Sequence, residues 1–317
     1  MDRLGAMEIF VLVVETGSFS AAARRLNLGQ PAVSKIVAQL EARLGVRLLL
    51  RSTRRLTPTE AGEAYYISAQ RALEDIKEAE AQVQASGLGL SGRLRISAPV
   101  TFARVHIIPH LDRLLAAHPQ LEIDIVLNDR NVDLIAEGID VALRLGDLDD
   151  SGLVARKLSR CQMKVLATPD YFRTMGKPGT PQEILHHQVV VYSLRQGGGQ
   201  RWLFRRAEEQ VQLTTRGRLT VSAAEGLRAA ILAGLGLAIT SEWMFAPELA
   251  RGEVVTVLDE WQLPALDLWA IYPSGRLMSA KARAFVDFVA ALPSLAGSRS
   301  EWASDKASQT TIHSQEE

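Results

Sequence analysis

Apolar residues near the start of the chain recur at the spacing of amphipathic helices. The first predicted helix ends at Gly17 and buries Met7, Phe10, Val11, Val13 and Val14. A second is expected over 21–26, capped by Ser18 or Ser20, and a third from Gln30 to Gly45. The third helix is expected to bury Val33, Ile36, Val37, Leu40 and Leu44. Because only 27–29 separate the last two helices, this segment predicts a helix-turn-helix.

The outward face of the third helix carries polar side chains. Gln30, Ser34 and Lys35 lie near its start and can donate to base edges or phosphates, and Gln39 also faces outward. Two short helices joined by a tight turn suit insertion into the major groove of DNA. An ordinary three-helix bundle with a polar surface is the alternative interpretation.

A basic hairpin and a long helix follow. The strand-like 46–50 leads into basic 51–55, which predicts a two-stranded wing that follows a DNA backbone, or else a solvated hairpin. Thr57, Pro58 and Glu60 fit a capping box with Thr57 as the cap. The helix then runs over 58–88 to a glycine-rich hinge at 89–92. Its length favours pairing with a second copy of the chain, and the alternative is a helix folded back on its own domain.

The remaining chain alternates between strand and helix patterns. Strands are expected at 93–98, 121–127, 139–145, 164–168, 189–192, 218–221, 237–240 and 266–272. Helices are expected at 99–118, 131–137, 223–233 and 280–292. This alternation predicts an α/β domain over 93–296 with a largely parallel sheet, and small ligands bind such sheets beyond the carboxyl ends of the strands. The polar 297–317 is expected to be a disordered tail.

Composition narrows the classes of protein. With 317 residues, 47% hydrophobic and 23% charged, the chain predicts two globular domains. The formal net charge of zero excludes a uniformly basic protein. However, residues 1–57 carry nine basic and four acidic side chains (+5), whereas 58–88 carry two and six (−4). This asymmetry favours a small polyanion-binding module, or else a solvated basic face.

Several chemistries are not expected. Cys161 is the single cysteine, which excludes a disulfide scaffold, a cysteine-based zinc site and a dithiol sensor, and it is interpreted as a small buried side chain. We expect no membrane span, because no apolar run is long enough to cross a bilayer. We expect no signal peptide, because Asp2, Glu8 and Glu15 interrupt the apolar stretch at the N-terminus, and a cytoplasmic location follows. The chain has no G-x-S-x-G, P-loop or H-E-x-x-H motif, so neither an enzyme nor a cofactor is expected.

At this point the sequence resembles the LysR-type transcriptional regulators along nearly its whole length. The motif "FVLVVETGSFSAAARRLNLGQPAVSKIVAQLEARLGVRLLLRSTRRLTPTEAG" carries the resemblance at the N-terminus, and "GRLRISAP", "IDVALRLGDLDDSGLVARKL" and "GLRAAILAGLGLAI" carry it further on. The resemblance implies an α+β multidomain fold. An all-α winged helix-turn-helix (1–57) and a linker helix (58–88) precede an α/β effector domain of two Rossmann-like subdomains, the type 2 periplasmic-binding-protein fold. The subdomains are expected at 93–166 with 268–296, and at 167–267.

The resemblance also implies a function. A homodimer or homotetramer is expected to bind an interrupted inverted repeat in promoter DNA. A small-molecule effector is expected in the cleft between the subdomains, and RNA polymerase is a candidate partner. A solute-binding protein, or an enzyme that uses the α/β domain, is the alternative.

Site residues follow from the matching positions. The recognition-helix positions are Gln30, Pro31, Ser34 and Lys35, and those that contact phosphates or form the wing are Ser20, Ser52, Thr53 and Arg54. The expected effector contacts are Ser97, Pro99, Thr101, Phe102, Arg144, Leu145, Gly146, Tyr192, Ser193, Ser222 and Ala223. The corner at Ala223 lacks the polar side chain that many relatives have. Thr101 and Arg144 suit an anion such as a carboxylate, and an intradomain salt bridge is the alternative for Arg144.

Overall fold

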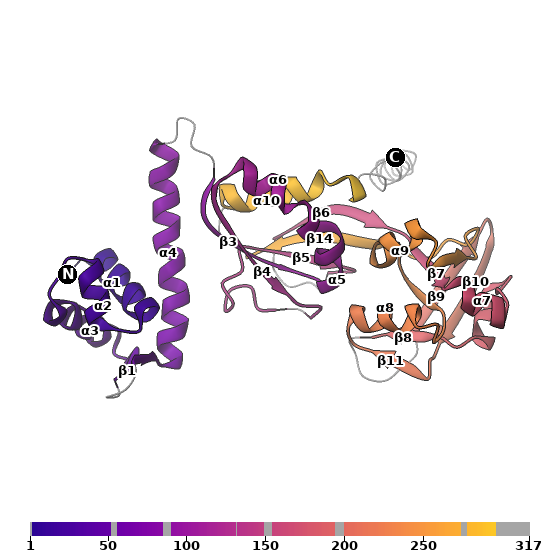
Figure 1. Ribbon diagram of the computed structural model, residues 1–317, viewed down its shortest axis with the longest axis horizontal. Coiled ribbons are helices and arrows are strands. Elements are labelled where there is room, and N and C mark those ends of the chain that lie inside the picture. The colour runs from indigo at the N-terminus through magenta and orange to yellow at the C-terminus, as the bar shows by residue number, and fades with distance from the viewer. Residues whose placement is uncertain are drawn as a thin grey trace, which may run out of the picture. The chain divides into compact units, whose positions relative to one another are not determined.

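The computed structural model describes residues 2–51, 56–84, 90–130, 132–148, 154–193, 200–273 and 278–295. The chain forms two compact units, one built on Met1–Arg93 and the other on most of the rest (Figure 1). The first unit contains α1 (Arg3–Thr16), α2 (Phe19–Arg25), α3 (Gln30–Leu44), β1 (Leu49–Arg51), β2 (Leu56–Pro58) and α4 (Glu60–Gln84). Among all the residues that the structure describes, no helix combines the length and apolar character needed to cross a bilayer.

Short polar side chains and glycines set the ends of the first helices. The Asp2 carboxylate accepts a hydrogen bond from the Leu4 N–H (3.1 Å), and the Ser18 hydroxyl accepts one from the Ala21 N–H (3.3 Å). Ser18 rather than Ser20 is therefore the cap of α2. Gly17 ends α1 at φ 62° and Gly45 ends α3 at φ 68°, a left-handed conformation that favours glycine.

One hydrophobic core joins the helices of the first unit. Phe10, Val33 and Leu40 are completely buried, and Ala69 of α4 belongs to the same core. The ring of Tyr65, also on α4, meets Phe10 edge-on at 5.3 Å between centroids. The first half of α4 thus packs on its own domain, and the pairing of this helix with a second copy of the chain stays a prediction. Leu44 was expected in this core but is 40% exposed, because α3 ends there.

The start of α4 differs from the predicted capping box. Thr57 lies in the hairpin of β1 and β2, where it pairs with Leu50, and α4 begins only at Glu60, so Thr57 is two residues too early to be its cap. Thr59 is the cap instead: its hydroxyl accepts a hydrogen bond from the Gly62 N–H (2.9 Å) and donates one to the Arg47 carbonyl (2.8 Å). One threonine therefore fixes α4 to the chain that enters the hairpin.

The second unit contains two groups of strands. Its strands are β3 (Ser91–Ala98), β4 (Gln120–Leu127), β5 (Val141–Leu145), β6 (Val154–Cys161), β7 (Met163–Ala167), β8 (Val190–Tyr192), β9 (Gln200–Arg206), β10 (Glu209–Thr215), β11 (Leu219–Val221), β12 (Ala238–Ser241), β13 (Val255–Val257) and β14 (Leu266–Tyr272). Its helices and helical turns are α5 (Val100–Phe102), η1 (Ala103–Ile107), η2 (Ile108–His110), α6 (Leu111–Ala117), α7 (Pro169–Met175), η3 (Pro181–His186), α8 (Ala224–Leu232), η4 (Glu242–Phe245), α9 (Ala246–Arg251) and α10 (Ala280–Ala290).

The sheets are mixed rather than largely parallel. The first group is a five-stranded sheet in the order β4-β3-β5-β14-β6, in which β3 and β5 are parallel and β14 is antiparallel to both its neighbours. The second group contains the antiparallel β12-β7-β13, the parallel β11-β8 and the hairpin β9-β10. The chain crosses from the first group to the second between β6 and β7 and returns between β13 and β14. The prediction of a largely parallel sheet is wrong because β14 returns against the direction of its neighbours.

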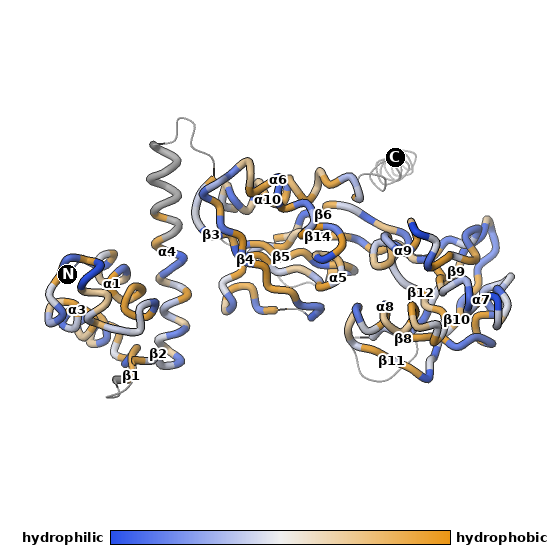
Figure 2. The backbone as a smooth tube through the Cα atoms, viewed as in Figure 1, coloured by the Kyte–Doolittle hydropathy of each residue, from blue (hydrophilic) through white to orange (hydrophobic). Residues whose placement is uncertain are grey.

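Hydrophobic strands and one helix form the core of the first group. The central strands are strongly hydrophobic in Figure 2, and Ile96, Leu143 and Ala270 on β3, β5 and β14 are completely buried. Phe285 and Val289 of α10 are also completely buried. Strands with apolar side chains on both faces need cover on both faces, which explains their near-continuous apolar sequence.

Several predicted elements differ in detail. The helix expected over 99–118 is divided into α5, η1, η2 and α6, and Pro109, which lacks an N–H, lies in η2. Over 132–137 the structure has turns instead of a helix, because the Asp133 carboxylate accepts hydrogen bonds from the Ile135 and Ala136 N–H groups. The sequence did not predict β6, α7, α9 or the hairpin β9-β10. The expected tail at 297–317 lies outside the described residues.

Candidate functional site

The expected DNA-contacting residues lie on α2 and α3. A tight turn joins these helices: Asn27 has φ 54°, and the Leu28 N–H donates a hydrogen bond to the Ala23 carbonyl (3.0 Å). Ala22 and Ala23 on α2 share the core with Val33 on α3. Small alanines allow the helices to approach closely, which fixes the direction of α3 relative to α2.

The opposite face of α3 is polar and accessible. Gln30, Pro31, Lys35 and Gln39 are exposed, Ser34 is half-buried, and Ser20 is exposed on α2. Gly29 at the N-cap has no side chain to cover the first turn. Arg24 and Arg25 add positive charge at the end of α2. The arrangement can offer hydrogen-bond donors and positive charge to a polyanion.

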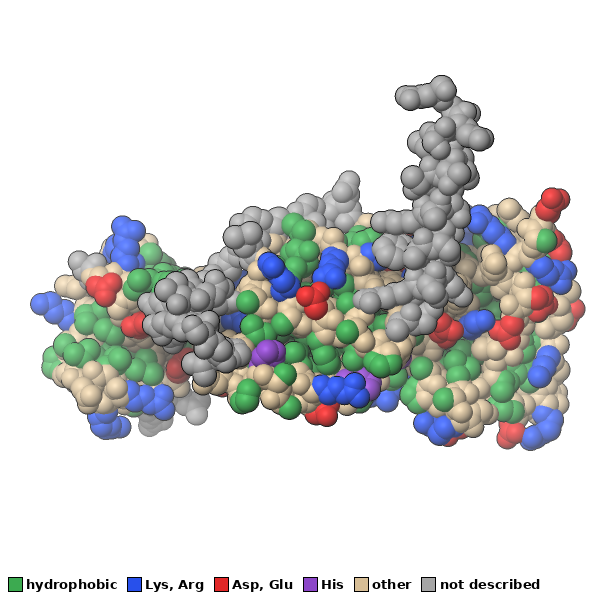
Figure 3. All heavy atoms as spheres, turned by 90° about the horizontal axis from the view of Figure 1, so that it is seen from above, with side chains coloured by type: hydrophobic (Ala, Val, Ile, Leu, Met, Phe, Trp, Pro, Cys, Tyr) green, Lys and Arg blue, Asp and Glu red, His purple; other side chains and the backbone are tan. Residues whose placement is uncertain are grey.

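Strands β1 and β2 form the predicted hairpin, with Leu50 paired to Thr57 and Arg51 to Leu56. Ser52, Thr53 and Arg54, expected at its tip, lie outside the described residues. On the face seen in Figure 3, basic and acidic side chains are interspersed across the molecule. The +5 of residues 1–57 is therefore a local excess rather than part of a uniformly basic surface.

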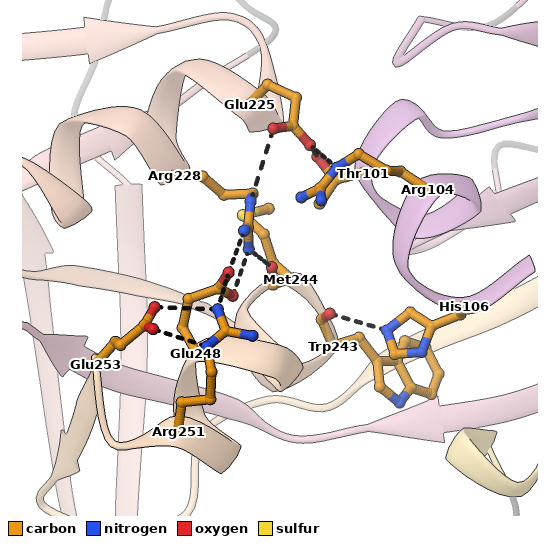
Figure 4. A network of polar contacts seen from close by, with 10 residues as sticks. All are labelled: Thr101, Arg104, His106, Glu225, Arg228, Trp243, Met244, Glu248, Arg251 and Glu253. Carbon is orange, nitrogen blue, oxygen red and sulfur yellow. Dashed lines mark hydrogen bonds and ion pairs between the residues drawn. The ribbon is translucent and has the colours of Figure 1, made fainter. Parts of the chain in front are cut away.

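The residues of α5 that were predicted to contact the effector join the two groups of strands. Thr101 donates a hydrogen bond from its hydroxyl to Glu225 on α8 (2.8 Å), and Arg104 Nε donates to the same carboxylate oxygen (3.0 Å) (Figure 4). Phe102 lies against Trp243 of η4, with 5.5 Å between ring centroids. Partial burial opposes ionisation of Glu225, but these hydrogen bonds and the charges of Arg104 and Arg228 outweigh it and lower the pKa of this carboxyl.

His106 strengthens the same junction. Its Nε2 lies 2.9 Å from the Trp243 carbonyl oxygen, so that nitrogen carries the proton and donates (Figure 4). The ring is buried, and this burial lowers the pKa of His106 below its usual value. The neutral imidazole is thus the form that fits here.

Ser97 and Arg144 meet within the five-stranded sheet. Arg144 Nη1 donates to the Ser97 hydroxyl (3.2 Å) and to the Leu143 carbonyl (3.0 Å). Leu145 pairs with Leu268 of β14, and Gly146, at φ 107°, donates from its N–H to the Asp267 carbonyl (2.9 Å). Arg144 is therefore held at the end of β5, next to the strand that returns from the second group.

The opposing residues come from β8, β11 and the start of α8. The Ser193 N–H donates to the Val221 carbonyl (2.9 Å), and Ser222 and Ala223 are exposed. Burial, followed by the negative charge of Asp129, raises the pKa of Tyr192 to about 12. Ala223 provides no side-chain cap to α8, as the sequence indicated.

The structure adds residues that the sequence did not single out. Asp129, just after β4, accepts hydrogen bonds from the Val100 N–H (3.0 Å) and the Ala224 N–H (3.2 Å). Glu225, His106 and Trp243 also join the two groups of strands. The position of Asp129 directly after a predicted strand was the one available signal, since ligand sites gather at strand ends. Nothing local marked the other three.

Other candidate groups are structural. Cys161 is buried with its Sγ 3.1 Å from the Ser241 hydroxyl, and burial raises the pKa of the thiol to about 12. His187 Nδ1 lies 3.2 Å from the Tyr171 hydroxyl. Within the described residues, no group of three or more His, Cys, Asp or Glu side chains is arranged to hold a metal ion.

A helix-turn-helix unit joined to an α/β domain with polar contacts between two groups of strands is the organisation of a bacterial transcriptional regulator with an effector-binding domain. Residues 4–63 match the bacterial regulatory helix-turn-helix protein, lysR family, and residues 87–293 match the LysR substrate binding domain. The chain therefore belongs to the LysR family of transcriptional regulators, as the resemblance predicted.

Related sequences and solved structures agree with this family. The chain is 38% identical over 284 residues to an HTH-type transcriptional regulator of Xanthomonas campestris, covering 89% of this chain and 83% of that one. It is 35% identical over 285 residues to the regulator PtxR of Pseudomonas aeruginosa, covering 90% and 91%. The structure of CrgA, a LysR-type regulator from Neisseria meningitidis, is similar with a TM-score of 0.58 and 32% identity, covering 90% of this chain and 97% of that one.

Proposed function

We propose that this regulator binds an interrupted inverted repeat in promoter DNA as a homo-oligomer. In this proposal, α3 enters the major groove, where Gln30 and Ser34 contact bases and Lys35 contacts the nearby phosphate backbone, with Pro31 and Gln39 beside them. Ser20, Ser52, Thr53 and Arg54 contact the backbone. The observation that carries the proposal is the exposed polar face of α3 opposite a completely buried one. A helix with one anchored face and one face of donors suits groove recognition.

We further propose that a small-molecule effector binds where the two groups of strands meet. The proposed contacts are Ser97, Pro99, Thr101, Phe102, Arg144, Leu145, Gly146, Tyr192, Ser193, Ser222 and Ala223. Both groups contribute to this junction through Thr101, Glu225 and Trp243. An effector acts if it binds one arrangement of the two groups better than another. The full-length structure of the regulator LysG from Corynebacterium glutamicum contains arginine as a bound effector, an example of such a ligand.

We also propose that the protein acts in the cytoplasm, where promoter DNA and RNA polymerase are found. In this proposal it does not catalyse a reaction. In this proposal the DNA-binding domain spans 1–57, the linker helix 58–88, the hinge 89–92 and the effector domain 93–296. The pairing of β7 with β12 and β13 supports a subdomain border near residue 162 rather than 166.

Selection from random duplex DNA at two salt concentrations tests the proposal. The full-length protein is expected to enrich an inverted repeat, with affinity that falls steeply as salt rises, because phosphate contacts release counterions. If no sequence is enriched at either salt concentration, the DNA-binding proposal is wrong.

Two substitutions on α3 test the division of roles. Gln30→Ala is expected to reduce discrimination at one base pair by about 1–3 kcal/mol while sparing random DNA. Lys35→Ala is expected to weaken binding to every duplex and to lower the salt slope by about one unit. Fluorescence anisotropy with selected and random duplexes measures both effects. Lys177→Ala, at an exposed lysine of the second unit, is the control and should change neither. Equal losses on both duplexes for Gln30→Ala would contradict its role in base recognition.

A further inference from the structure

The carboxylate of Asp129 connects the two groups of strands at the proposed effector site. The Asp129 Oδ1 atom accepts a hydrogen bond from the Val100 N–H (3.0 Å), and Oδ2 accepts one from the Ala224 N–H (3.2 Å). Val100 belongs to the first group of strands and Ala224 to the second. One side chain therefore satisfies main-chain donors on both sides of the junction.

The loop after β4 holds Asp129 in place. The Asn128 N–H donates to the Ala98 carbonyl (3.0 Å), and the Asn128 side-chain oxygen accepts from the Arg130 N–H (2.9 Å). Neither Pro99 nor Ala223, which precede the two donors, supplies a capping side chain. The carboxylate of Asp129 thus does for two segments at once what a local capping residue does for one.

A second carboxylate occupies the neighbouring donors. Glu225 accepts hydrogen bonds from the Thr101 hydroxyl (2.8 Å) and from Arg104 Nε (3.0 Å) (Figure 4). The sequence indicated that Thr101 would suit an anionic effector, but its hydroxyl proton is directed to Glu225. A free carboxylate at this place would compete with two carboxylates of the chain itself and meet their like charge.

We propose that Asp129 determines effector specificity. Its carboxylate already accepts hydrogen bonds from the Val100 and Ala224 N–H groups, and it thereby excludes the free carboxylate of an effector from these donors. The effector group that faces Asp129 is accordingly a cation or a neutral hydrogen-bond donor. This inference rests on the proposed function in one respect, namely that the effector binds at this junction.

Chemical rescue of full-length Asp129→Ala tests the inference. Removing the carboxylate leaves two N–H groups that a small anion can satisfy, so the Tm is expected to fall by several degrees and sodium acetate to restore at least half of the loss. Sodium chloride at equal concentration should not restore it, and the wild-type Tm should not respond to acetate beyond the chloride effect. Asp129→Asn, which keeps the shape of the side chain and one acceptor, is the milder variant if Asp129→Ala does not fold. Its Tm should fall less.

Asp133→Ala is the matched control. Its carboxylate also accepts from two N–H groups, those of Ile135 and Ala136, but within its own exposed turn. Acetate should not restore any loss of stability in this variant. An unchanged Tm in Asp129→Ala, or a lowered Tm that acetate does not restore, would overturn the inference.

Matched ligands of opposite charge test the chemical class. Benzoate and benzamidine have similar shape, and the wild-type protein is expected to gain more thermal stability from benzamidine, with this preference lost in Asp129→Ala. Stronger stabilisation of the wild type by benzoate would refute the exclusion of carboxylates. These assays use no DNA, so a failure of the DNA-binding proposal would leave them unaffected. Successful DNA selection together with failed rescue would remove only the role of Asp129.

Discussion

Arg228 and Glu248 are charged side chains that lie almost entirely inside the second unit, each only 5% exposed. Arg228 makes two hydrogen bonds to the Glu248 carboxylate (2.9 and 2.6 Å) and donates to the Met244 carbonyl (Figure 4). Its guanidinium carbon also lies over the Phe245 ring, 5.2 Å from the centroid. Its Nε lies 3.7 Å from Glu225, which holds Thr101. The buried pair therefore supports the start of α8, where the effector domain's two groups of strands meet.

Glu248→Ala is expected to cost about 3–5 kcal/mol of unfolding free energy, because it leaves the Arg228 guanidinium buried without its main partner. Burial opposes ionisation of Glu248, but the hydrogen bonds and charge of Arg228 outweigh it and lower the pKa of this carboxyl. The folded state thus favours the carboxylate, and its contribution is complete above the unfolded pKa of about 4.3 and is lost as pH falls through the lower folded pKa.

Urea titrations followed by circular dichroism measure this difference as a function of pH. Glu253→Ala is the control: this carboxylate bonds Arg251 at the surface, where solvent screens an ion pair and its loss costs little. If the two variants lose equal stability near neutral pH, the buried pair does not have the role assigned to it.

The chain that enters the β1-β2 hairpin restricts which residue can occupy the first turn of α4. Gly62 lies in the first turn of α4, where a Cβ atom would be 2.0 Å from the Leu48 carbonyl oxygen. That carbonyl also accepts the Thr59 N–H (2.9 Å) and so cannot move without breaking the cap of α4. Only glycine allows the long helix to start this close to the chain that enters β1.

Gly62→Ala is expected to destabilise the first unit, although alanine normally stabilises a helix by about 0.5–1 kcal/mol relative to glycine. Thermal unfolding followed by circular dichroism measures the effect. Gly226→Ala is the matched control, because Gly226 is also the third residue of its helix and a Cβ there meets Val221 at an ordinary 3.5 Å. Stabilisation by both substitutions would show that the contact with Leu48 relaxes freely.

Elements with strong local signals were predicted well. Gly17, Ser18, Pro31 and Gly45 define the ends of the first three helices, and caps act through neighbouring residues that a sequence displays directly. The cap of α4 was predicted two residues too early, because Thr57 and Thr59 are equally good caps by residue type. Pairing of Thr57 with Leu50 across the hairpin decides between them.

For the molecule as a whole, the proposed homo-oligomer brings two recognition helices to one DNA. A duplex with two half-sites is then expected to bind at least about 100-fold more tightly than a duplex with one, because the second contact is intramolecular. Adding about 5 bp between the half-sites, half a helical turn, should remove most of this gain, since it turns one half-site to the opposite side of the duplex. Anisotropy titrations with these three duplexes measure the gain. Equal affinity for all three would contradict paired recognition.

The helix-turn-helix, its exposed polar face, the α/β character of the second unit and the family could all be predicted from the sequence. These features depend on local periodicity, caps and motifs, which are readable along the chain. The antiparallel direction of β14, the partners of Arg144 and Thr101, and the bridge made by Asp129 became visible only in the folded chain. Those features depend on groups far apart in the chain, such as Asp129 and Ala224. Their pairing is set by packing of the whole domain rather than by any spacing within the sequence.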